Sequence, residues 1–184
     1  MGRSRAVTSI ILALGLFLMP SGIPKAEEPR YGLGKLATEA GIKAWDIDIA
    51  PNGAGLPQGR GTVQQGATLY AAKCAACHGP TGTEGPNDRL IGGQGSLATE
   101  HPIKTIGSYW PYATTLYDYI FRAMPFTAPQ SLMPEEVYAL VAWLLHQNGI
   151  ISKDTIMDAV TLRAVRMPNR DVFISDLGSD GSGR

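Results

Sequence analysis

Two cysteines three positions apart, with a histidine directly after the second, constrain this chain more than any other feature. The stretch reads Cys74-Ala75-Ala76-Cys77-His78, and its two cysteines are the only ones in the 184 residues. Two thiols can add across the two vinyl groups of a haem, and two intervening residues bring both sulfurs to the same porphyrin edge. His78 then follows as the proximal ligand of the iron. The sequence predicts one covalently attached haem c.

Two other chemistries use closely spaced cysteines. A structural zinc site needs four ligands, and no second cluster of cysteine and histidine occurs here to complete one. A thioredoxin-like dithiol is expected beside a βαβ unit, which this sequence does not indicate. Haem attachment at Cys74 and Cys77 is therefore favoured over a zinc site, a redox dithiol or a chance spacing.

The N-terminal residues have the pattern of a secretory signal. Arg3 and Arg5 precede an uncharged apolar run over 6–19, and Ala26 lies directly before two glutamates. The run is about fourteen residues long, short of the roughly 20 that span a bilayer. We expect 1–26 to be a cleaved signal peptide, with a retained membrane anchor as the alternative. Export to the periplasm fits the haem motif, because haem c is attached outside the bacterial inner membrane.

The remaining chain carries a small negative net charge and divides into three expected segments. Three of the 16 basic side chains lie in the signal, so the exported chain carries a net charge of about −3, which gives no electrostatic basis for binding nucleic acid. We expect an extended N-terminal wrap over 27–61, a monohaem domain over 62–149, and a C-terminal extension over 150–184 with a disordered end. The N-terminal wrap could instead dock on a partner.

Apolar periodicity predicts an all-α domain. The expected helices cover residues 36–45, 62–76, 113–123 and 134–149. Gly66 and Tyr70 are four positions apart, so they share one face of the 62–76 helix. A glycine there permits the close approach of a second helix, and Trp143 is the large side chain that we expect to meet this face.

Met124 is the predicted sixth ligand of the iron. It ends the 113–123 helix, and Pro125 after it pushes its backbone out of helical geometry, so the thioether can turn towards the iron. Ligation by His78 and Met124 would raise the reduction potential and suit electron carriage. The predicted metal ligands are therefore His78 and Met124, and the predicted cofactor-binding residues are Cys74, Cys77, His78 and Met124.

Several other residues compete for roles at the haem. Met133 and Met167 also precede prolines, but Met133 fits the entry of the last helix and Met167 lies in the tail. His101 precedes a proline and is more typical of a surface histidine. Arg89 could pair with a propionate, although an exposed arginine is the simpler interpretation.

The order of helix, haem motif, loop, helix, methionine and helix resembles the class I cytochrome c fold over 62–149. Longer stretches are similar to the cytochrome subunits of periplasmic sulfur-oxidising molybdoenzymes: the haem subunit of sulfite dehydrogenase (sulfite:cytochrome c oxidoreductase) and the sulfane dehydrogenase cytochrome of the Sox thiosulfate pathway. These stretches are residues 105–120, 122–125 and 128–132 in the domain. Residues 45–47 and 55–57 in the N-terminal wrap, called the leader below, and residues 167–170 in the C-terminal extension, called the tail, match as well.

The resemblance implies an electron-transfer subunit with loop-rich N- and C-terminal extensions around a class I domain. A molybdenum-containing subunit would oxidise sulfite or sulfane sulfur, and this chain would pass the electrons to a cytochrome c or an oxidase. Catalysis at sulfur would then lie in the partner, with no catalytic residue here and no membrane span after cleavage. The Sox subunit is a longer, two-haem protein, so one motif favours the sulfite dehydrogenase type or a one-domain Sox-like variant. The alternatives are a free periplasmic electron carrier, and a haem enzyme or sensor with an open sixth position.

Overall fold

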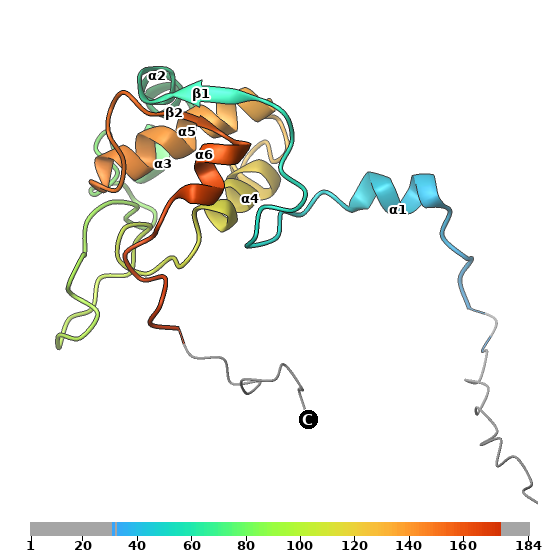
Figure 1. Cartoon of the computed structure of the whole chain (residues 1–184), viewed down its shortest axis with the longest axis horizontal. Helices are drawn as coiled ribbons and strands as arrows, with labels where there is room; N and C mark the ends of the chain where they lie inside the picture. Colours follow the sequence, from blue (N-terminus) through green and yellow to red (C-terminus); the bar gives the residue numbers. More distant parts are fainter. Residues whose placement is uncertain (1–30, 32, 174–184) are drawn as a thin grey trace, which may run out of the picture. The chain divides into compact units, whose positions relative to one another are not determined.

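The computed structural model describes residues 31 and 33–173. The predicted signal peptide over 1–26 and the predicted disordered end lie outside these residues. In chain order the elements are α1 (Glu39–Trp45), β1 (Arg60–Thr62), α2 (Val63–Lys73), α3 (Ala75–His78), α4 (Ala113–Ala123), α5 (Pro134–Gln147), β2 (Ile156–Asp158) and α6 (Ala159–Ala164) (Figure 1). The regular structure of the described residues is six helices and two three-residue strands joined by long loops, which confirms the predicted fold class. None of its helices is long and apolar enough to cross a membrane.

Helix α5 forms the centre of the core. Pro134 occupies its first turn, and every residue from Val137 to Leu145 is buried. A helix that is covered on all sides must be apolar all round, and this stretch is uncharged throughout. Figure 1 shows α5 in orange between α2 and α4, and it packs against both of them and against the two strands.

Helices α2 and α5 cross in close contact at Gly66. A Cβ atom added there would lie 2.0 Å from the backbone oxygen of Ala139, so no larger residue fits this crossing. One turn later the rings of Tyr70 and Trp143 stack with their centroids 4.0 Å apart. The predicted meeting of Gly66 and Tyr70 with Trp143 is confirmed.

A short antiparallel ribbon joins segments on either side of the helical domain. Strand β1 pairs with β2 in the register Gly61↔Met157. A Cβ atom at Gly61 would lie 2.3 Å from the backbone nitrogen of Ala139, so the ribbon lies directly on α5. The sequence did not indicate these strands, because three residues are too few for an alternating pattern to be recognised.

Helix α4 binds the segment that leads into the domain. The backbone N–H of Ile49 donates a 2.8 Å hydrogen bond to the Asp118 carboxylate, and both residues are buried. The Thr114 hydroxyl donates a 2.8 Å bond to the backbone oxygen of Pro51. The leader is therefore attached to α4 from Ile49 onwards. The buried side chain that holds it there, Asp118, was not singled out by the sequence analysis.

Candidate haem-binding site

The haem motif begins where α2 ends. Cys74 has φ −124° and ψ −36°, which interrupts the single helix predicted over 62–76, and α3 then makes one turn from Ala75 to His78. The N–H groups of Cys77 and His78 both donate to the backbone oxygen of Cys74, at 3.1 and 3.0 Å. This turn holds both cysteines and the histidine in one short, hydrogen-bonded unit. Cys74 is half-buried and Cys77 is exposed.

The imidazole of His78 is oriented by the loop that follows it. Its Nδ1 lies 2.9 Å from the backbone oxygen of Asp88. A carbonyl oxygen only accepts, so Nδ1 carries the proton and Nε2 keeps its lone pair for a metal ion. Within the described residues Nε2 makes no hydrogen bond. The histidine is thus held in the tautomer that an iron ligand requires.

The rest of that loop folds back on the motif. The N–H of Asn87 donates a 2.9 Å bond to the backbone oxygen of Cys77. A Cβ atom at Gly85 would lie 2.3 Å from the same oxygen, so a glycine is needed where the chain passes this closely. The Tyr70 hydroxyl donates a 2.8 Å bond to the backbone oxygen of Gly79. These contacts fix the conformation of the loop that carries the backbone carbonyl of Asp88.

The partial burial of Cys74 affects the ionisation of its thiol. Burial raises its pKa to about 11, an effect that nearby Lys73 opposes and Cys77 reinforces. Cys74 therefore stays protonated at neutral pH in the unmodified chain. The described residues contain no group of three or more His, Cys, Asp or Glu side chains that could hold a metal ion.

The candidates for the sixth ligand differ in their environments. Met124 ends α4 in an extended conformation, with φ −121° and ψ 148°, and is half-buried against the core. Met133 is 62% exposed, and its N–H donates to Glu136 at the entry of α5. Met167 is buried in the tail, and His101 is exposed. Of these four, only Met124 is half-buried beside the core.

The segment from the motif to Met124 contains apolar side chains that are only partly covered. Between Cys74 and Met124 the half-buried residues that pack against the core are Cys74, Ala75, Leu90, Ile91, Trp110, Phe121 and Met124. A haem is a flat, largely apolar group, and covering such surface is favourable. The thiols of Cys74 and Cys77 and the Nε2 of His78 are the groups that a covalently bound haem requires, and the segment up to Met124 contains half-covered apolar side chains.

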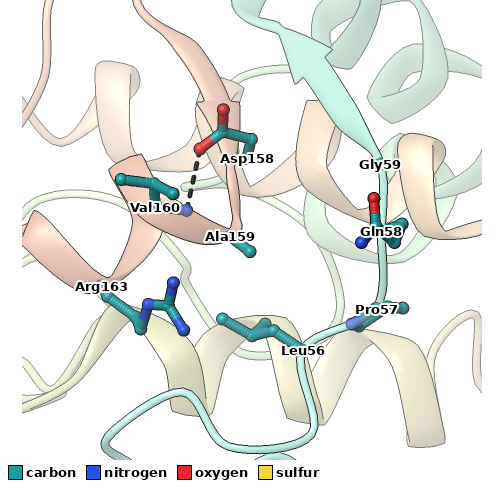
Figure 2. Close-up of a pocket in the computed structure, with 8 residues that line it drawn as sticks. All are labelled: Leu56, Pro57, Gln58, Gly59, Asp158, Ala159, Val160 and Arg163. Atoms are coloured by element: carbon teal, nitrogen blue, oxygen red, sulfur yellow. Dashed lines mark hydrogen bonds between the residues drawn. The ribbon is translucent and has the colours of Figure 1, made fainter.

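A separate hollow lies between the leader and α6, and sequence analysis gave no sign of it. It has a volume of about 340 Å³, and Figure 2 shows the eight residues that line it. Asp158 accepts a 2.9 Å hydrogen bond from the N–H of Val160 at the start of α6, and Arg163 extends beside Leu56. None of the lining residues belongs to the haem motif, so this hollow is distinct from the candidate haem site.

Comparison with known proteins identifies a cytochrome c domain. The family model described as cytochrome c oxidase, cbb3-type, subunit III matches residues 61–144. The crystal structure of the sulfane dehydrogenase SoxCD from Paracoccus pantotrophus contains a chain that is 40% identical, with 83% of this chain and 76% of that chain covered and a TM-score of 0.73. No curated protein matches. The fold and the site define a protein that transfers electrons through haem c. The chain belongs to the c-type cytochromes related to the cytochrome subunit of sulfane dehydrogenase, as the sequence resemblance predicted.

Proposed function

We propose that this chain is the monohaem cytochrome subunit of a periplasmic, molybdenum-containing sulfite or sulfane dehydrogenase. It accepts electrons from the molybdenum subunit and passes them to a cytochrome c or an oxidase. The observation that carries this proposal is the 40% identity to a chain of SoxCD, because the match covers 83% of this chain and extends far beyond the family-matched residues 61–144. The predicted signal peptide supports the periplasmic location.

The residues of this chain would act as follows. Cys74 and Cys77 hold the haem through thioether bonds, and the single pair of cysteines limits the chain to one such group. His78 is the proximal ligand, kept in orientation by the Asp88 carbonyl at 2.9 Å. Met124 would supply the other ligand of the iron. When bound, the haem supplies a one-electron redox couple, and ligation by histidine and methionine raises its potential.

With both His78 and Met124 holding the iron, no position would remain for a substrate. The oxidation of sulfur therefore takes place in the partner, and this chain contributes binding, orientation and potential. An open sixth position would instead suit the haem enzyme or sensor, and wild-type protein would then bind carbon monoxide in its ferrous form. A free electron carrier would be isolated without a molybdenum subunit.

Anaerobic reduction of the holoprotein tests the proposal. The purified cytochrome is mixed with sulfite, with and without the molybdenum subunit from the same host, and the absorbance of the ferrous haem is followed. We expect fast reduction that requires the molybdenum subunit. A parallel sample with a sulfane donor separates the two substrates. If neither donor reduces the complex, the proposed function is wrong, while the haem site remains open to direct test.

A further inference from the structure

Helix α1 exposes large apolar side chains that pack against nothing in the described chain. Ile42 and Trp45 are three positions apart on α1, so they lie on the same side, and they are 54% and 88% exposed. No residue of α1 is buried. Exposed aromatic and aliphatic groups gathered in one short segment are typical of a binding surface.

The helix is well specified locally, although it is too short to be stable alone. The Thr38 side chain accepts a 3.1 Å hydrogen bond from the N–H of Gly41, and the N–H of Asp46 bonds back to Ile42. Isolated helices of seven residues are marginal in water, and most helices are stabilised by packing an apolar face. Since α1 buries no residue in this chain, the stabilising surface is expected on another molecule.

The attachment point of α1 is firmly held. Ile49, four residues after Trp45, is buried and donates its N–H to the carboxylate of Asp118 on α4. A partner that binds α1 is therefore connected to the haem domain through three intervening residues, 46–48, and a buried hydrogen bond. This arrangement would tie a bound partner closely to the domain that carries the haem motif.

The extent of the SoxCD match indicates which partner this is. Residues 46–184 make up about three quarters of the chain, so a match over 83% must include residues before 46. The general cytochrome family model, in contrast, begins only at residue 61. The segment around α1 is thus shared with a sulfur dehydrogenase rather than with cytochrome domains in general.

We propose that α1 docks through Ile42 and Trp45 into an apolar groove on the molybdenum-containing dehydrogenase subunit. This inference rests on the proposed function and names the element that binds its partner. Lys43 lies two positions before Trp45, on the opposite side of the helix, where it remains hydrated while the apolar side is covered. An apolar helix face in a groove is a recurring mode of recognition, with large aromatic residues as its anchors.

The test compares variants of the full-length holoprotein that differ at single exposed positions. Trp45→Ala and Ile42→Ser remove the proposed contacts, and Val160→Ser is the matched control, because Val160 is also an exposed β-branched residue on a short helix. Each variant is purified with haem attached and titrated with the purified molybdenum subunit. We expect the Kd to rise about 30-fold for Trp45→Ala, as for a truncated hot-spot residue, and to stay unchanged for Val160→Ser.

Two further readouts separate docking from folding and from function. The haem spectrum and thermal unfolding of the Trp45→Ala protein should equal those of the wild type, because α1 contributes no buried residue. If both α1 variants bind the molybdenum subunit as tightly as wild type, the inference is overturned and the proposed function stands. If the wild-type protein binds no molybdenum subunit, both the inference and the proposed function are wrong. If the α1 variants lose only self-association of this chain, the occupant is a second copy and the inference is overturned.

Discussion

The hydroxyl group of Tyr70 donates a 2.8 Å hydrogen bond to the backbone oxygen of Gly79, the residue directly after His78. The ring of Tyr70 is buried and stacks on Trp143 of α5. Burial raises the pKa of Tyr70 to about 12, with smaller contributions from Cys74 and Glu84. The phenol is therefore a neutral donor at physiological pH, and it connects the packing of α2 and α5 to the haem motif.

Replacing Tyr70 by phenylalanine should weaken the fold without removing the aromatic stack. The change removes one of the two donors to the Gly79 carbonyl, because the N–H of Gly82 still donates to it at 3.2 Å. The loss of one hydrogen bond of this kind costs about 0.5–1.5 kcal/mol. Urea unfolding of the holoprotein measures this loss. Tyr119→Phe is the control, because Tyr119 is 47% exposed and should change stability by less than about 0.5 kcal/mol. Equal stability of the two variants would show that the Tyr70 hydrogen bond contributes nothing.

Gly66→Ala should destabilise the protein although alanine favours helices. In an open helix the change would gain about 1 kcal/mol. Here the added Cβ would meet the Ala139 backbone oxygen at 2.0 Å and the Trp143 Cβ at 2.7 Å, and neither atom can move away by a side-chain rotation. Overpacking of this kind costs about 1–3 kcal/mol, so we expect a net loss in urea unfolding.

Gln64→Ala on the same helix provides the comparison for Gly66→Ala. Gln64 is exposed, so this variant reports helix propensity alone and should be neutral or slightly stabilising. A Gly66→Ala protein as stable as the Gln64→Ala protein would contradict the close crossing of α2 and α5.

The features that sequence analysis predicted well are those with a local signature. The bounds of α4 follow from its apolar stripe and from Pro125, and α5 begins at Pro134 as expected. The contact of Gly66 and Tyr70 with Trp143 was also foreseen, because a small and a large residue at helical spacing call for a complementary partner. The haem motif itself is a contiguous string.

The features that were missed depend on contacts between distant segments. The Ile49–Asp118 hydrogen bond joins residues 69 positions apart, and nothing in the sequence around either residue indicates it. The break at Cys74 and the Asp88 carbonyl beside His78 arise from the folded loop rather than from any residue preference. The roles of Cys74, Cys77, His78 and Met124 at the haem stay predictions.

Asp118→Asn should loosen the leader. The Asp118 carboxylate accepts from both the Ile49 N–H and the Arg122 guanidinium, at 2.8 Å each. Burial acts to raise the pKa of this carboxyl, but these hydrogen bonds and the Arg122 charge together lower it. An asparagine that keeps the Ile49 bond turns an N–H donor towards the guanidinium, so we expect a loss of about 1–3 kcal/mol and faster hydrogen exchange at Ile49.

Asp171→Asn is the matched control for Asp118→Asn. Asp171 pairs with Arg166 on the surface, where both side chains are largely exposed, and such pairs contribute about 0–1 kcal/mol. If Asp171→Asn and Asp118→Asn cost the same, burial of the Asp118 carboxylate has no energetic consequence.

Glu84 should make stability depend on pH in the acid range. Hydrogen bonds from the side chains of Thr81 and Thr83, joined by their backbone N–H groups, lower the Glu84 pKa from 4.5 to about 2. The stabilisation from this carboxylate is complete above about pH 4.5 and is lost as the pH falls towards about 2. Glu84→Gln should therefore be less stable than wild type at neutral pH, and the difference should vanish near pH 2. A difference that is constant with pH would exclude ionisation of Glu84 as its cause.

Met124→Leu tests the second axial ligand. Leucine has nearly the volume of methionine, so the half-buried packing of this residue is largely kept while the thioether is removed. We expect a lower reduction potential in a potentiometric titration, since methionine ligation raises it, and binding of carbon monoxide to the ferrous protein without denaturant. Met133→Leu is the control, because Met133 is 62% exposed at the entry of α5 and should leave both properties unchanged. If Met133→Leu lowers the potential and Met124→Leu does not, the ligand is Met133, and the loop between α4 and α5 must fold differently around the bound haem.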